Sequence, residues 1–230
     1  MTDLAQHLDE LVPLANAVSL KGRSVLDIGC GNGALARRIA AETGAASVIG
    51  IDTDAAQIAK NIEKGRNVNY QVGGVQALGL ADSSIDVAVL MKSLHHVPMA
   101  QMDAGFAEIL RVLRPDGQVY ICEPAYSGDF NEILKIFHDE GEVRAAAQAA
   151  LGRATAGGGF KVAGRHDYIR PLHFADIEGF KQKMLYLPWL ENHITKDIET
   201  RVEAAFAAHA NPDGSGDYTS HMLVVSLVKA

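Results

Sequence analysis

The chain has 230 residues, of which 48% are hydrophobic and 21% are charged, the balance of a globular protein with one sizeable core. Its net charge of −7 and scattered basic residues argue against a nucleic-acid partner, because binding to phosphates requires clustered Lys and Arg. The sequence shows no long apolar run and no secretory pattern at the start, and its two cysteines, Cys30 and Cys122, give no disulfide framework. These features predict a cytoplasmic protein without a membrane partner. A small molecule is the expected partner.

The first half of the chain alternates between strand-like and helix-like segments. Residues 4–20 have the pattern of an amphipathic helix interrupted at Pro13. Between Ser24 and about Pro124, apolar runs predict strands at 24–28, 47–52, 68–72, 85–91 and 118–123, and helices at 33–42, 54–64 and 99–113. Such alternation is typical of parallel strands that are connected by crossover helices.

The second half is less regular. It predicts a helix over 128–150 that is loosened at Gly141, then a flexible loop or a substrate lid at the three glycines 157–159. Strands at 168–174 and 221–229 and helices at 175–185 and 195–210 follow. We expect one domain over 1–230, with a helical cap at 1–23, a cofactor-binding core at 24–123 and substrate-side helices and strands at 124–230.

The most informative segment is V-L-D-I-G-C-G-N-G, in which Gly29, Gly31 and Gly33 follow an apolar run. A glycine turn between a strand and a helix lets a ligand lie against bare backbone near helix N–H groups. The dinucleotide-binding turn reads G-x-G-x-x-G, whereas this chain has G-x-G-x-G. Asp27, two residues before Gly29, would repel a pyrophosphate but suit an ammonium or sulfonium group.

A second carboxylate follows the next strand. V-I-G-I ends in Asp52, which lies one helix and one turn after Gly33. A carboxylate at this position can accept both hydroxyls of a ribose. The alternative is that Asp52 only caps the helix predicted from Asp54, although Thr53 or Asp54 could cap it equally well.

Four motifs in order across residues 24–123 resemble class I S-adenosylmethionine-dependent methyltransferases: V-L-D-I-G-C-G-N-G, V-I-G-I-D, I-D-V-A-V-L-M-K-S-L-H-H-V and I-L-R-V-L-R-P-D-G-Q. The resemblance implies a Rossmann-like, mainly parallel α/β sheet of seven strands, with helices on both faces and an antiparallel C-terminal edge hairpin. It also implies S-adenosylmethionine as cofactor. The residues implied to hold it are Asp27, Gly29 and Gly31 at the methionine portion, Asp52 at the ribose and Thr53 beside the adenine. Met91 is implied to border the cofactor.

The chain departs from the family at the adenine. An acidic residue often follows the third strand there, but Gly74 occupies the aligned position. Gln76 is close by, and its carbonyl could accept the same hydrogen bond, although a solvated loop residue is the alternative.

Candidate catalytic residues follow the fourth and fifth strands. His96 and Glu123 are our candidates, because the carboxyl ends of these strands face the crevice in which open α/β sheets bind ligands. The histidine and cysteine spacings predict no metal site.

The predicted function is methyl transfer from S-adenosylmethionine to a small-molecule acceptor by in-line displacement. Two alternatives remain open at this point. One is a protein that binds S-adenosylmethionine without transferring its methyl group, and the other is a nicotinamide-dependent oxidoreductase on a similar sheet.

Overall fold

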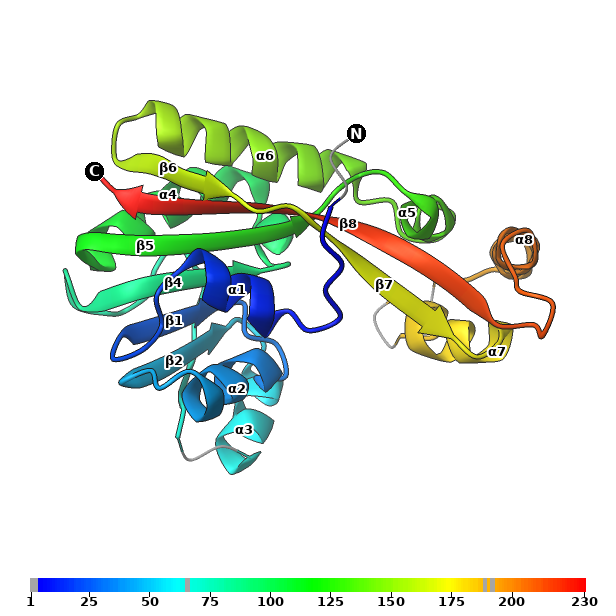
Figure 1. Cartoon of the computed structure of the whole chain (residues 1–230), viewed down its shortest axis with the longest axis horizontal. Helices are drawn as coiled ribbons and strands as arrows, with labels where there is room; N and C mark the ends of the chain where they lie inside the picture. Colours follow the sequence, from blue (N-terminus) through cyan, green and yellow to red (C-terminus); the bar gives the residue numbers. More distant parts are fainter. Residues whose placement is uncertain (1–3, 65–66, 188–189, 191–192) are drawn as a thin grey trace. The chain divides into compact units, whose positions relative to one another are not determined.

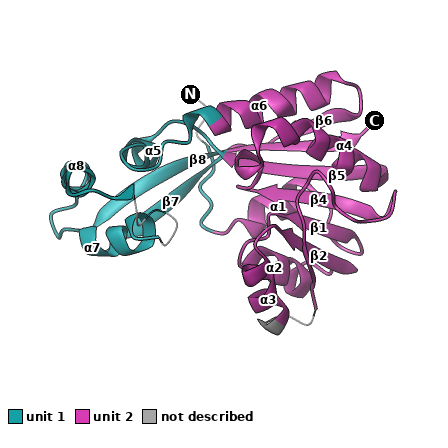
Figure 2. Ribbon diagram, turned by 180° about the vertical axis from the view of Figure 1, so that it is seen from behind, with its two compact units in different colours: residues 1–8, 124–142, 168–222 teal, residues 9–123, 143–167, 223–230 magenta. Residues whose placement is uncertain are grey.

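The computed structural model describes residues 4–64, 67–187, 190 and 193–230. The chain forms two compact units (Figure 2). The large unit contains residues 9–123, 143–167 and 223–230, and the small unit contains residues 1–8, 124–142 and 168–222. These boundaries differ from the predicted 1–23, 24–123 and 124–230, and the assignment of the whole chain to one domain stays a prediction.

A mainly parallel sheet forms the centre of the large unit (Figure 1). Its strands follow the order β3-β2-β1-β4-β5-β8-β6. Their bounds are β1 Ser24–Ile28, β2 Ser47–Asp52, β3 Asn69–Val72, β4 Ile85–Met91, β5 Leu113–Pro124, β6 Phe160–Arg165 and β8 Gly216–Lys229. The pairs β3–β2, β2–β1, β1–β4 and β4–β5 are parallel, whereas β6 and β8 are antiparallel. The carboxyl ends of β1, β2, β3 and β4 therefore share one edge of the sheet.

Alternate side chains of these strands supply the core. Leu26 and Ile28 point to the face where α4 and α6 complete a continuous apolar cluster. Helices α1 and α2 pack on each other, and α2 and α3 pack on β2. The helix bounds are α1 Leu11–Ala17, α2 Ala34–Glu42, α3 Ala55–Lys64, α4 Met102–Val112 and α6 Gly141–Ala156.

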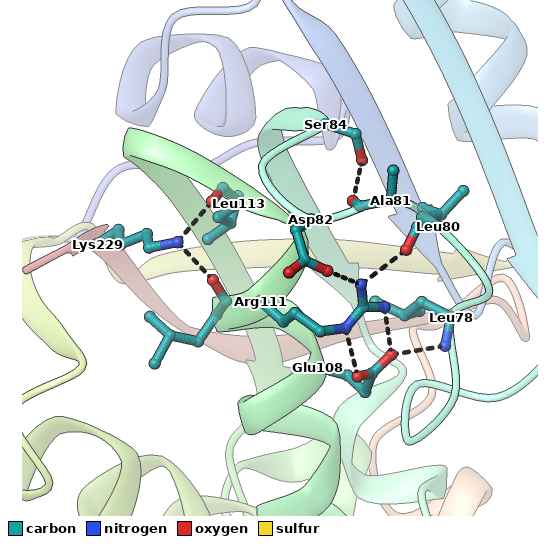
Figure 3. Close-up of polar contacts among 10 residues, drawn as sticks. Leu78, Leu80, Ala81, Asp82, Ser84, Glu108, Arg111, Leu113 and Lys229 are labelled. Atoms are coloured by element: carbon teal, nitrogen blue, oxygen red, sulfur yellow. Dashed lines mark hydrogen bonds and ion pairs between the residues drawn. The ribbon is translucent and has the colours of Figure 1, made fainter.

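A polar network holds α4 against the loop that precedes β4 (Figure 3). The Arg111 guanidinium donates to both carboxylate oxygens of Glu108, at 2.7 and 2.8 Å, and to Asp82 and the Leu80 carbonyl. Lys229 on β8 donates to the carbonyls of Leu110 and Leu113, each at 2.7 Å, where α4 ends. Arg111 of the fourth motif therefore has a structural role.

The small unit has an aromatic core. Strand β7 (Tyr168–Phe174) pairs antiparallel with the first half of β8. Helices α5 (Asp129–Leu134), α7 (Ile177–Phe180) and α8 (Lys196–Ala207) and the π-type segment η3 (Lys181–Leu185) complete the unit. Its apolar cluster contains the buried rings of Phe130, Phe174, Phe180, Phe206 and Tyr218.

The predicted fold class is confirmed, but the described residues form eight strands where we predicted seven. Strand β6 lies where no strand was predicted. The glycines at 157–159 form the turn before it, and the Ala230 N–H donates to the Gly159 carbonyl at 3.0 Å. Within the described residues, no helix is both long and apolar enough to cross a bilayer.

Three predicted helices differ most from the observed ones. The helix predicted over 4–20 is limited to α1, and Pro13 lies in its first turn, where backbone N–H groups have no helical partner. The helix predicted over 128–150 is two helices, because α6 starts at Gly141 rather than passing through it. The Asp139 carboxylate accepts the Gly141 N–H at 2.9 Å at that start. The helix predicted over 175–185 consists of α7 and η3.

Candidate functional site

The glycine turn after β1 has the backbone conformation that its sequence predicts. Gly29, Gly31 and Gly33 have φ of 72°, 51° and 69°, a region that favours glycine. The N–H groups of Gly29 and Cys30 both donate to the Ile51 carbonyl, at 2.8 and 3.0 Å. The turn is therefore attached to the end of β2.

Gly29 also needs to be glycine for steric reasons, which gives a testable prediction. A Cβ at Gly29 would lie 2.5 Å from Ser93 Cβ, whereas Gly22 has the same φ of 72° and open space around it. We expect Gly22→Ala to cost about 1–2 kcal/mol of unfolding free energy for the left-handed backbone alone. Gly29→Ala should cost about 1–3 kcal/mol more through overpacking. Urea denaturation of both variants measures the difference, and equal losses would contradict the steric argument.

Asp52 connects the end of β2 to the glycine turn. One carboxylate oxygen accepts the Gly31 N–H at 2.8 Å, and the other accepts the Asp54 N–H at 3.0 Å. Asp54, in turn, accepts the Gln57 N–H at 2.9 Å in the first turn of α3. Asp54 therefore caps α3, and the alternative that Asp52 is the helix cap is wrong.

Two side chains that support the turn were missed in the sequence. The amide of Asn61, fully buried on α3, donates to the Gly31 carbonyl at 2.7 Å. The Ser93 hydroxyl donates to the Ile28 carbonyl at 2.6 Å. Asn61 follows the buried Ile58 by three positions, so a polar residue on the apolar face of a helix was the available signal. Ser93 gives no comparable signal.

A cavity of about 600 Å³ opens at this edge of the large unit. Six of the predicted site residues line it: Gly29, Gly31, Asp52, Thr53, Gln76 and His96. Other lining residues, which we did not predict, come from the end of β1 and from the segments that follow β3 and β4: Ile28, Gly73, Gly74, Val75, Lys92, Ser93, Val97, Pro98 and Gln101. The structure thus brings together residues that are up to 73 positions apart, from Ile28 to Gln101.

Lys92 is the cation in the described lining, and its backbone is unusual. It follows β4 with φ of 55°, which is uncommon for a residue with a side chain. Its ammonium forms an ion pair with Glu10, at the start of α1. Asp9 binds both terminal nitrogens of Arg38 on α2, at 2.6 and 2.8 Å. The cap predicted at 1–23 therefore contacts the site through Glu10, while residues of α1 itself do not line the cavity.

Asp27 is not among the residues that line the cavity. Its side chain is 2% exposed, and Oδ2 has no hydrogen-bond partner among the described residues. Burial raises the pKa of Asp27 to about 7, and the nearby charge of Asp52 contributes to the rise. A buried carboxylate oxygen without a donor is costly, and a cationic ligand would remove that cost.

Glu123 and Met91 are also outside the described lining. Glu123 is 2% exposed, accepts the Leu94 N–H at 2.8 Å and forms a hydrogen bond with His95 Nδ1. These bonds hold the single turn η1 (Leu94–His96), whose last residue, the exposed His96, lines the cavity. Met91 is buried at the end of β4. The cofactor role of Met91 and the catalytic roles of His96 and Glu123 stay predictions.

Comparison with known proteins agrees with this geometry. Residues 25–117 match the methyltransferase domain family. Over 117 residues the chain is 30% identical to a sterol 24-C-methyltransferase of Yarrowia lipolytica, a match that covers 48% of the chain and 30% of the relative. It is 34% identical over 108 residues to a ubiquinone biosynthesis O-methyltransferase of Pseudomonas fluorescens, with 45% of each covered.

A solved structure extends the likeness to the fold of nearly the whole chain. It belongs to a protein of Bacillus halodurans C-125 that is proposed to be a methyltransferase, with a TM-score of 0.66 and 17% identity over 96% of this chain and 98% of that one. The chain spans less than half the length of the two curated relatives named above. The matched domain over residues 25–117, the fold and the glycine-turn site together support a class I S-adenosylmethionine-dependent methyltransferase.

Proposed function

We propose that the chain transfers a methyl group from S-adenosylmethionine to a small-molecule acceptor. The observation that carries the proposal is the cavity itself. It combines the glycines Gly29 and Gly31, the Asp52 carboxylate and the exposed His96 in its lining, around a volume of about 600 Å³. The match to a methyltransferase domain favours this activity over a nicotinamide-dependent oxidoreductase.

The residues present fit this cofactor. The unpaired Oδ2 of Asp27 suits the ammonium group of the methionine portion, and the turn at Gly29 and Gly31 leaves room for that portion. Asp52 would accept the ribose hydroxyls, with Thr53 and Gln76 beside the base. When bound, the cofactor supplies an electrophilic methyl group on its sulfonium.

The chain itself contributes orientation and a site for a proton. Holding an acceptor atom in line with the methyl group removes much of the entropic barrier, because effective molarities for well-oriented groups are large. We propose that His96 faces the acceptor and can take its proton. Glu123 acts as a positioning residue, since it fixes the backbone at Leu94 and the ring of His95.

Two observations support a small molecule as acceptor. One of the two relatives is named for sterols and the other for ubiquinone biosynthesis, and sterols and ubiquinone are small molecules. The net charge of −7 is also unfavourable for a nucleic-acid substrate.

The proposed roles of His96 and Glu123 predict different mutant kinetics. His96→Ala should lower kcat by about 10²-fold or more if His96 is a general base, and should leave S-adenosylhomocysteine affinity within about twofold. Glu123→Gln keeps an acceptor for the Leu94 N–H and should retain more turnover than Glu123→Ala. Steady-state kinetics and calorimetry on the three variants measure this. Full turnover in all three would limit the contribution of the chain to proximity and orientation.

The function is tested by following S-adenosylhomocysteine release from S-adenosylmethionine in the presence of pooled metabolites, separated into sterol-like, quinone-like and polar pools. We expect release above the acceptor-free background with at least one pool, and its loss in His96→Ala. Tight binding of the cofactor without release for any pool would favour the alternative of a binding protein.

A further inference from the structure

The cavity wall after β3 contains an unusual pair, Gly74 and Gln76. The Ala77 N–H donates to the Gly74 carbonyl at 3.1 Å, which closes a tight turn around Val75 and Gln76. This turn folds the Gln76 side chain back over Gly74. A Cβ at position 74 would lie 2.4 Å from Gln76 Oε1 and 2.7 Å from Nε2. The amide of Gln76 therefore occupies the space that a side chain at position 74 would fill, and both residues line the cavity.

The amide is not held in one orientation. Gln76 is exposed, and neither its oxygen nor its nitrogen has a hydrogen-bond partner among the described residues. The last torsion of a glutamine is broad and nearly two-fold, so an unrestrained amide can turn its oxygen or its NH₂ toward a ligand. A carboxylate in the same place could only accept a hydrogen bond.

We propose that the Gly74–Gln76 pair relaxes the selectivity of the cofactor site at position 6 of the purine. The amide oxygen accepts from a 6-amino group, and the amide NH₂ donates to a 6-oxo group. An acidic residue would weaken the binding of a hypoxanthine base, because its oxygens would face another acceptor. The Gly74–Gln76 pair does not have this effect. This inference rests on the proposed function, which puts the base beside Gln76.

The test compares S-adenosylhomocysteine with S-inosylhomocysteine by calorimetry on the wild type and three variants. Gln76→Glu is the matched control, because it has the same size but can only accept. Any group that contacts N1 of the base is the same in all four proteins. Its contribution to the affinity ratio of the two compounds therefore cancels when the ratios of different proteins are compared. Thermal unfolding verifies that each variant is folded.

We expect the preference for the adenine compound to rise by about tenfold or more in Gln76→Glu relative to the wild type, the size of one unpaired charged hydrogen bond. Gln76→Ala should weaken both compounds by about 2- to 10-fold and leave their ratio within about twofold. Gly74→Ala should resemble Gln76→Ala, because its Cβ displaces the amide.

An unchanged affinity ratio in Gln76→Glu would overturn the inference while leaving the proposed function intact. Equal affinities of Gln76→Ala and wild type for both compounds would do the same. Absence of S-adenosylhomocysteine binding by the wild type would instead contradict the proposed function.

Discussion

Replacing Asp52 with alanine is expected to weaken S-adenosylhomocysteine binding by about 10- to 150-fold or more, while the fold survives. Hydrogen bonds to a charged group are worth about 1.5–3 kcal/mol, and the proposed contacts are to two ribose hydroxyls. The variant also removes the carboxylate oxygen that accepts the Gly31 N–H at 2.8 Å and so holds the glycine turn. Calorimetry at one pH measures the loss.

Asp54→Ala is the matched control for this experiment. Asp54 is also a carboxylate at the end of β2, but its contact is the Gln57 N–H at the start of α3. Its removal should cost about 1 kcal/mol of unfolding free energy as a lost helix cap, with affinity unchanged within about twofold. If Asp54→Ala lost as much affinity as Asp52→Ala, the assignment of the ribose to Asp52 would be incorrect.

Asp27 should make the stability of the ligand-free protein depend on pH. Burial raises its folded pKa from an ordinary value of 3.8 to about 7. Between these values the folded state binds a proton that the unfolded state has released, so stability falls as pH rises from about 4 to about 7. The asparagine side chain of the Asp27→Asn variant cannot ionise. The difference in unfolding free energy between this variant and the wild type should therefore change in favour of the variant by up to about 1.4 kcal/mol per pH unit across this window. Above the window the difference should stay constant.

Ligand binding should reverse this effect. If the ammonium group of the ligand lies against Asp27, it favours the ionised carboxylate, so binding at pH values below the folded pKa releases a proton. Calorimetry at about pH 6.5 in buffers of different ionisation enthalpy should show the release of more than about half a proton for the wild type and close to none for Asp27→Asn. Proton uptake, or equal values for the two proteins, would exclude contact between Asp27 and the ammonium group.

Much of the cofactor side could be predicted because its signals are local. The bounds of β1, β2, β4 and β7 agree with the predicted strands, and adjacency in sequence places Gly29, Gly31 and Asp52 at strand ends. Parallel pairing then brings those ends to one edge, as the register of Asp27 beside Gly50 and Val89 confirms.

The remaining elements depend on contacts that are distant in the sequence. Strand β6 buries Phe160 but exposes most of its other side chains, so its pattern is weak and its pairing with β8 determines it. Glu123 lies at the end of a strand as expected, yet its carboxylate forms hydrogen bonds with the Leu94 N–H and with His95 Nδ1, which are 29 and 28 residues away. The bonds of Asn61 and Ser93 to the glycine turn likewise span 30 and 65 positions. Single-sequence patterns do not encode such pairings.

The most direct test of the central claim, that this cavity holds S-adenosylmethionine, is a calorimetric titration of the protein at about pH 8, above the folded pKa of Asp27, with S-adenosylhomocysteine and, separately, with NAD. We expect saturable one-to-one binding of S-adenosylhomocysteine that is strongly weakened in Asp52→Ala, and no measurable binding of NAD. Saturable binding of NAD together with no heat from S-adenosylhomocysteine would contradict the account.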